Sequence, residues 1–260
     1  MTGMINAGSG GLTGWRVLQR TEDRQMQMLK NDPVVQRETS YFRDRIEITG
    51  SAEALVGDYQ MLTVALKAFG LEDDIGSRAL IRQVLESDLN DNASLANRLS
   101  DKRYLRLARA FDFAGANNSE EPGFADRISQ AYLERELERR VGASDETLRL
   151  ALNARREIED MAGRDSSDKT LWYEVFGNPP LRKVFQDAFG FGPAYGKLPI
   201  DRQLQEFTRA SERVLGSASF DDITRPNVTD RLIQRFLLRS QMGASPVQNR
   251  YSAALTLLSQ

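Results

Sequence analysis

The sequence predicts an all-α protein built from many helices. Two observations lead to this prediction. Apolar residues recur at spacings of three and four along most of the chain, and no run of four to eight residues alternates cleanly between apolar and polar side chains. At 260 residues, with 40% hydrophobic and 28% charged side chains, the chain is long enough to bury a substantial core. We expect a multihelical architecture with two helical subdomains and a weak internal echo between them.

The first helices can be placed by their boundary residues. Residues 1–12 are rich in Gly, Ser and Ala, so we expect a mobile N-terminal tail, followed by a helix over 13–30. Asp32 then has the position of an N-cap and Pro33 that of the first residue of a second helix. Ser51 predicts the start of a third helix, which we expect to run unbroken to Phe69.

The remaining helices follow from the same spacing and from loops rich in Gly, Pro, Asn and Asp. The segment 163–168 contains no apolar anchor and is the best internal boundary, so we expect one helical subdomain over 13–162 and a second over 163–260. The further predicted helices cover residues 77–87, 94–99, 101–113, 124–141, 145–162, 170–176, 181–189, 200–215, 228–242 and 247–258.

The internal echo joins two of these helices. Both end in Ala-Phe-Gly followed by an apolar residue, at Gly70 and at Gly190, so each predicts a glycine cap in the left-handed region with the next apolar side chain folding back. A duplication would explain the echo, but two ordinary helix ends are the explanation that the sequence favours. The matching residues are Met61, Val64, Ala68, Phe69, Gly70 and Leu71 against Leu181, Val184, Ala188, Phe189, Gly190 and Phe191.

Composition excludes several classes of chemistry. The chain has no histidine and no cysteine, which rules out histidine triads, thiol nucleophiles and thiolate or imidazole metal sites. Acidic and basic residues are interleaved, with a net charge of -2, so we expect no nucleic-acid binding. The apolar runs are too short for a membrane span, and we identify no catalytic, cofactor-binding or metal-binding residues.

Two segments are candidates for binding a partner. Trp15 lies in a helix with few other apolar residues, so it is either part of an interface or part of the core. Near the C-terminus, apolar side chains recur with the spacing of a coiled-coil seam, which indicates a docking face for a partner or for the chain's own domain. The residues of this C-terminal stripe are Val247, Tyr251, Ala254 and Leu258.

Several blocks in order carry a resemblance to a known family. They include Leu18-Gln19-Arg20-Thr21, Ala68-Phe69-Gly70-Leu71, Val84-Leu85-Glu86-Ser87, Leu99-Ser100-Asp101 and Trp172-Tyr173. The chain resembles the uncharacterised bacterial family number twelve-seventeen in the domain-of-unknown-function series. The resemblance implies an all-helical protein with no assigned reaction and no cofactor, from a family whose genes often sit among flagellar genes of alphaproteobacteria.

These observations together favour a non-enzymatic helical interaction protein, either a flagellum-associated assembly factor or a minor exported component. Its partner would be a protein, and its location the cytoplasm or, after export, the bacterial flagellum. Two alternatives stay open: an enzyme that uses carboxylates or magnesium in a helical cleft, and a structural homo-oligomer.

Overall fold

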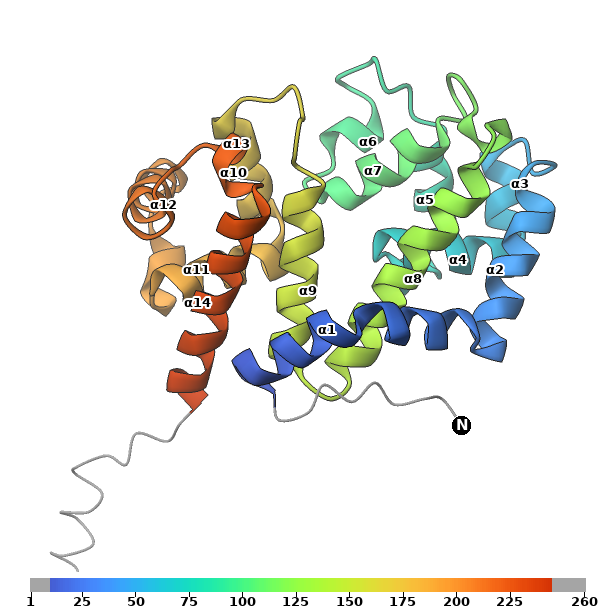
Figure 1. Ribbon diagram of the computed structural model, residues 1–260. Coiled ribbons are helices and arrows are strands. Elements are labelled where there is room, and N and C mark those ends of the chain that lie inside the picture. The colour runs from blue at the N-terminus through green and yellow to red at the C-terminus, as the bar shows by residue number, and fades with distance from the viewer. Residues whose placement is uncertain (1–9, 245–260) are drawn as a thin grey trace, which may run out of the picture. The chain divides into compact units, whose positions relative to one another are not determined.

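A computed structural model describes residues 10–244 of the chain (Figure 1). Within this range the chain forms fourteen α-helices and three short 3-10 helices, and no residue there lies in a strand. The predicted all-α class is therefore confirmed.

The helices group into two compact units. Of the described residues, the first unit takes 17–146 and 176–178, and the second takes 10–16, 147–175 and 179–244. The chain therefore divides near residue 146, earlier than the boundary expected at 163–168, because α9 (Glu146–Glu159) groups with the second unit.

The first unit has its core around α4, which packs mainly against α8 and α2. The apolar positions of α4 fall on one face at helical spacing, and Met61, Leu62 and Leu66 are fully buried there. The helices of this part of the chain are α1 (Gly11–Lys30), α2 (Pro33–Ile46), α3 (Ala52–Gly57), α4 (Tyr59–Phe69), η1 (Glu72–Asp74), α5 (Arg78–Leu85), α6 (Leu95–Arg98), α7 (Lys102–Phe111), η2 (Asn118–Glu120) and α8 (Phe124–Gly142).

The start of α2 follows the predicted cap. The Asp32 carboxylate accepts hydrogen bonds from the backbone N–H groups of Val34 and Val35, at 2.9 and 3.4 Å, and Pro33 occupies the first helical position. Asp32 also binds Arg140 of α8 at 2.9 Å, so this cap ties the start of α2 to the long helix. One residue thus serves both local and tertiary structure.

The prediction of one unbroken helix from Ser51 to Phe69 is wrong, because the chain forms two helices there that are separated at Asp58. Ser51 does cap α3, accepting from Ala54 N–H at 3.2 Å, but α3 ends at Gly57 and Asp58 is extended, with φ −95° and ψ 108°. Asp58 then caps α4 as a new helix. The physical reason is local: aspartate satisfies the free amides of a helix start better than it fits a helix interior.

The second unit has an aromatic core. Trp172 packs edge-on against Phe185, Phe207 and Phe220, with ring centroids 5.4, 5.9 and 4.9 Å apart, and its indole N–H donates to Ala218 O at 3.0 Å. The remaining helices are α10 (Asp168–Gly177), α11 (Pro179–Phe189), η3 (Pro193–Lys197), α12 (Ile200–Leu215), α13 (Phe220–Ile223) and α14 (Pro226–Ala244).

The two echoed helices, α4 and α11, end in the same way. Gly70 and Gly190 are both left-handed, at φ 69° and 81°. The amide after each glycine donates back across the last turn, from Leu71 to Leu66 O at 2.8 Å and from Phe191 to Gln186 O at 2.9 Å. The predicted glycine caps are confirmed.

The correspondence extends to the helices that pack most closely on α4 and α11, which are α8 and α14. Five of ten successive positions are identical between them, and the last of these, an arginine, lies against the capping glycine in both units. This agreement in sequence and contact favours a duplicated helical unit over two unrelated helix ends. The identical positions are Asp126, Arg127, Gln130, Leu133 and Arg135 in α8 against Asp230, Arg231, Gln234, Leu237 and Arg239 in α14.

Candidate functional site

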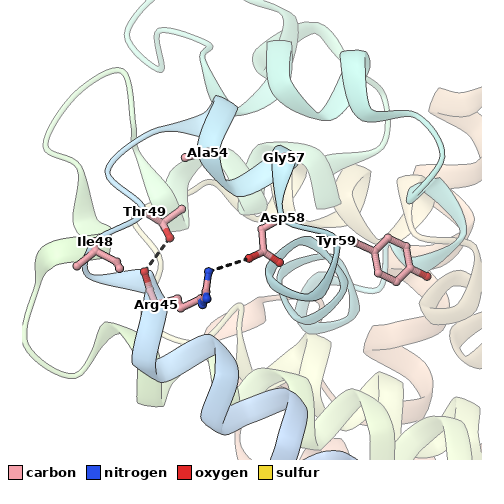
Figure 2. A pocket seen from close by; sticks show the side chains of 7 residues that line it. All are labelled: Arg45, Ile48, Thr49, Ala54, Gly57, Asp58 and Tyr59. Carbon is pink, nitrogen blue, oxygen red and sulfur yellow. Dashed lines mark hydrogen bonds and ion pairs between the residues drawn. The ribbon is translucent and has the colours of Figure 1, made fainter.

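A hollow of about 580 Å³ opens on the surface of the first unit, where α2 ends and where α3 and α4 meet (Figure 2). It combines a charged pair with exposed apolar side chains. Its lining residues are Arg45, Ile48, Thr49, Ala54, Gly57, Asp58 and Tyr59. We call this set the α2–α4 hollow.

The wall from residue 45 to 51 is fixed by hydrogen bonds that close the end of α2. The amide of Thr49 donates to Ile46 O at 3.0 Å, and its hydroxyl donates to Arg45 O at 2.7 Å. The chain then turns into Ser51, which caps α3. These bonds satisfy carbonyls that a helix end would otherwise leave free, so the turn holds Ile48 at the rim.

Asp58 is the polar centre of the hollow. One carboxylate oxygen accepts from the amides of Gln60 and Met61 at 2.9 and 3.1 Å, and the other accepts from the Tyr41 hydroxyl at 2.8 Å. Burial acts to raise the pKa of Asp58, but these hydrogen bonds and the charge of Arg45 outweigh it and lower the pKa. Asp58 is therefore ionised at neutral pH, and its hydrogen bonds hold the carboxylate in place.

Arg45 carries the exposed charge. Its guanidinium lies 4.7 Å from the centre of the Tyr41 ring and 3.8 Å from the nearest Asp58 oxygen, which is longer than a hydrogen bond. The side chain is 54% exposed, whereas that of Asp58 is 23% exposed. The hollow therefore presents a cation to the outside and keeps its anion inside.

The rim is apolar. Ile48 is 82% exposed and Tyr59 is 58% exposed, and they flank the charged pair from the α2–α3 turn and from the first position of α4 (Figure 2). Between them lie Ala54 and Gly57, and a methyl group built at Gly57 would meet no atom within 4 Å. A molecule that covers these two side chains removes their apolar surface from water.

Trp15, one of the sequence-based candidates, is not among the residues that line this hollow. Trp15 belongs to the second unit and is 1% exposed, with the Arg155 guanidinium 5.4 Å from its ring centre, so its indole contributes to packing. The C-terminal stripe of Val247, Tyr251, Ala254 and Leu258 lies outside the described residues. Of the predicted binding residues, the structure describes Trp15, and the role of the C-terminal stripe stays a prediction.

Sequence reasoning missed the α2–α4 hollow entirely. One signal was available: Gly57-Asp58 is a helix-stop residue followed by a helix-start residue, inside a segment that otherwise reads as one helix. The exposure of Ile48 had no signal, because an apolar residue in a turn reads equally well as buried.

Residues 10–244 contain neither a cluster of metal-binding side chains nor a membrane-spanning helix. No group of three or more aspartate or glutamate side chains in this range is placed to hold a metal ion. No helix in the same range is both long enough and apolar enough to cross a membrane.

Known proteins provide the remaining comparison. The X-ray crystal structure of protein AGR_C_984 from Agrobacterium tumefaciens is similar to this chain, with a TM-score of 0.74 and 26% sequence identity over 89% of this chain and 93% of that one. A comparison with curated proteins found no match. The family described as "Protein of unknown function (DUF1217)" matches residues 68–227, from the end of α4 to the start of α14. The chain belongs to this family.

Proposed function

We propose that this chain is a non-enzymatic protein-interaction protein of the bacterial flagellum, an assembly factor or minor exported component, and that it holds a protein partner at the α2–α4 hollow. The observation that carries the proposal is the exposure of Ile48 and Tyr59 on either side of the hollow. Covering such side chains on association removes apolar surface from water, which is the main driving force of protein binding.

The chemistry of the hollow supports binding rather than catalysis. Its two charged groups are Arg45 and Asp58, and the Asp58 oxygens are occupied by two amides and the Tyr41 hydroxyl. A carboxylate held in this way is a poor general base, because its hydrogen bonds stabilise the ionised form. The flagellar setting is supported by the resemblance to a family whose genes often lie among flagellar genes.

The proposal can be tested in cells with a single surface substitution. Ile48→Asp places a charge at the rim without removing any buried contact, and Val34→Asp is a matched control because Val34 is also an exposed β-branched residue, 51% exposed at the other end of α2. We expect Ile48→Asp to reduce swimming. When the protein is precipitated from cell extracts, we expect flagellar proteins to co-precipitate with wild type but not with Ile48→Asp. Val34→Asp should behave like wild type in both measurements.

Fractionation identifies the cellular role. Immunoblots of cytoplasm, hook-basal bodies and culture supernatant would compare wild-type cells with cells lacking flagellar export. Export-dependent appearance outside the cytoplasm identifies an exported component, and cytoplasmic protein bound to a flagellar protein identifies an assembly factor. Cytoplasmic protein with no flagellar partner, together with normal swimming of the Ile48→Asp strain, would overturn the proposal.

A further inference from the structure

The exposed cation of the α2–α4 hollow has a defined geometry. The Arg45 guanidinium carbon lies over the Tyr41 ring, 4.7 Å from the ring centre. The side chain is 54% exposed, so N–H donors of the guanidinium are available to an acceptor from outside. The nearest Asp58 oxygen is at 3.8 Å, beyond hydrogen-bond distance, and already accepts from the Tyr41 hydroxyl.

The nearby arginine of the same helix differs in this respect. Arg43 makes a hydrogen-bonded ion pair with Asp126 at 2.9 Å, and its side chain is 45% exposed. Arg45 is about as exposed, and no carboxylate of residues 10–244 lies within hydrogen-bond distance of it. Arg45 is therefore the cation at this surface whose N–H groups can receive a carboxylate from outside.

The apolar part of the hollow lies beside this cation. Ile48 is three residues beyond Arg45 in the chain, and Tyr59 directly follows Asp58, so the two apolar side chains flank the charged pair (Figure 2). Ala54 and Gly57 leave the space between them unfilled. A ligand that fills this space must present an apolar side chain next to an anionic group.

We infer that the occupant of the hollow is a segment of a partner protein in which a carboxylate lies beside a large apolar side chain on one face. The carboxylate pairs with Arg45, and the apolar side chain enters between Ile48 and Tyr59. This inference rests on the proposed function, since it specifies the ligand of the same hollow. A carboxylate fits better than a phosphate group, because Asp58 already lies 3.8 Å from the guanidinium and repels each further negative charge brought to it.

The turn between α10 and α11 corresponds in sequence to the turn between α3 and α4, but it lacks the carboxylate and the aromatic ring of the hollow. Gly177-Asn178 stands where α3 and α4 are separated by Gly57-Asp58, and Pro179 stands at the position of Tyr59. The carboxylate that orients the Tyr41 hydroxyl and the aromatic ring of the rim are thus both replaced in the second copy. The recognition chemistry is specific to the first copy.

The test uses the full-length protein and a displayed library of random peptides. We expect the selected peptides to carry Asp or Glu close to Leu, Ile or Phe, and to bind more weakly as salt is raised. Arg45→Gln should lower the affinity for a selected peptide by a factor of at least roughly ten. The matched variant Arg43→Gln should leave its affinity unchanged. Arg45→Glu should lose the acidic peptide and bind its lysine-substituted version.

The outcomes separate the inference from the proposed function. If Ile48→Asp abolishes binding but Arg45→Gln does not, the hollow is a docking site and the carboxylate inference is wrong. Peptides that bind more tightly when phosphoserine replaces the acidic residue would also overturn it. If selected peptides bind the Ile48→Asp and Arg45→Gln variants as well as wild type, both proposals fail. Circular dichroism and melting temperature verify that each variant is folded.

Discussion

Arg135 of α8 lies directly against Gly70 at the end of α4. A methyl group built on Gly70 would stand 3.1 Å from the Arg135 guanidinium carbon, and Arg135 Nη2 lies 3.5 Å from Phe69 O. Arg239 of α14 has the same relation to Gly190 at the end of α11. In both units the glycine provides the left-handed turn and the space that a cation at the C-terminal end of a helix requires.

Gly70→Ala should therefore destabilise the protein. At φ 69° a β-carbon strains the backbone, and the methyl group would also crowd Arg135, so we expect a loss of about 1–3 kcal/mol in the free energy of unfolding. Urea denaturation measures it. Gly57→Ala is the control, because no atom lies within 4 Å of the added methyl group. Equal stabilities of the two variants would contradict the argument.

Asp58→Ala should cost more than Asp58→Asn. Asparagine retains a side-chain oxygen for the amides of Gln60 and Met61, whereas alanine leaves both unsatisfied, so we expect a loss of about 1–2 kcal/mol for alanine. The corresponding residue of the α10–α11 turn is Asn178, which shows that this sequence plan accommodates asparagine. Thermal denaturation of the two variants checks the order, and equal losses would show that the negative charge of Asp58 matters more than its hydrogen bonds to the two amides.

Glu136 should make the stability of the protein fall in acid. Burial acts to raise its pKa, but hydrogen bonds from Arg139 and Arg140, at 2.6–2.8 Å, outweigh burial and lower the pKa below the ordinary value of 4.5. A lowered pKa in the folded state adds stability above pH 4.5 that is lost as the pH falls through the folded pKa.

Glu136→Gln should accordingly cost about 1.5–3 kcal/mol at neutral pH, because it weakens the charged hydrogen bonds from Arg139 and Arg140 while Arg140 keeps its ion pair with Asp32. The difference in the free energy of unfolding between the variant and wild type should decrease as the pH falls below 4.5. Urea denaturation at neutral and acid pH measures both effects. The control is Glu121→Gln, whose ion pair with Arg127 is about half exposed on both sides and should contribute less than about 1 kcal/mol. A constant difference at all pH values would refute the linkage.

The two tryptophans offer a further comparison. Both are 1% exposed, but the Trp172 indole N–H donates to Ala218 O, whereas the Trp15 indole N–H has no hydrogen-bond partner among the described residues. Trp172→Phe leaves the partly buried Ala218 carbonyl without its donor, whereas Trp15→Phe removes a donor that has no acceptor among the described residues. We expect Trp172→Phe to lose about 1–2 kcal/mol more than Trp15→Phe in chemical denaturation. A larger loss for Trp15→Phe would indicate a partner for its indole.

Local sequence was sufficient for most of the helices. Asp32, Ser51 and Gly70 act through bonds to residues two to five positions away, so their roles can be read along the chain. The echo at Gly190 was predictable for the same reason. The break at Asp58 also has a local cause, the pair Gly57-Asp58. The apolar spacing continues across this pair, however, and therefore predicts one unbroken helix.

The sequence by itself thus determined the all-α class, most helix ends and the paired glycine caps, because these depend on hydrogen bonds within one or two turns. Only the tertiary structure decided that Trp15 is buried, that Ile48 is exposed, and that Tyr41 and Arg45 of α2 both face Asp58. The physical reason is that burial and charge pairing depend on which distant segments pack together, and an apolar or charged residue has the same local pattern in either environment.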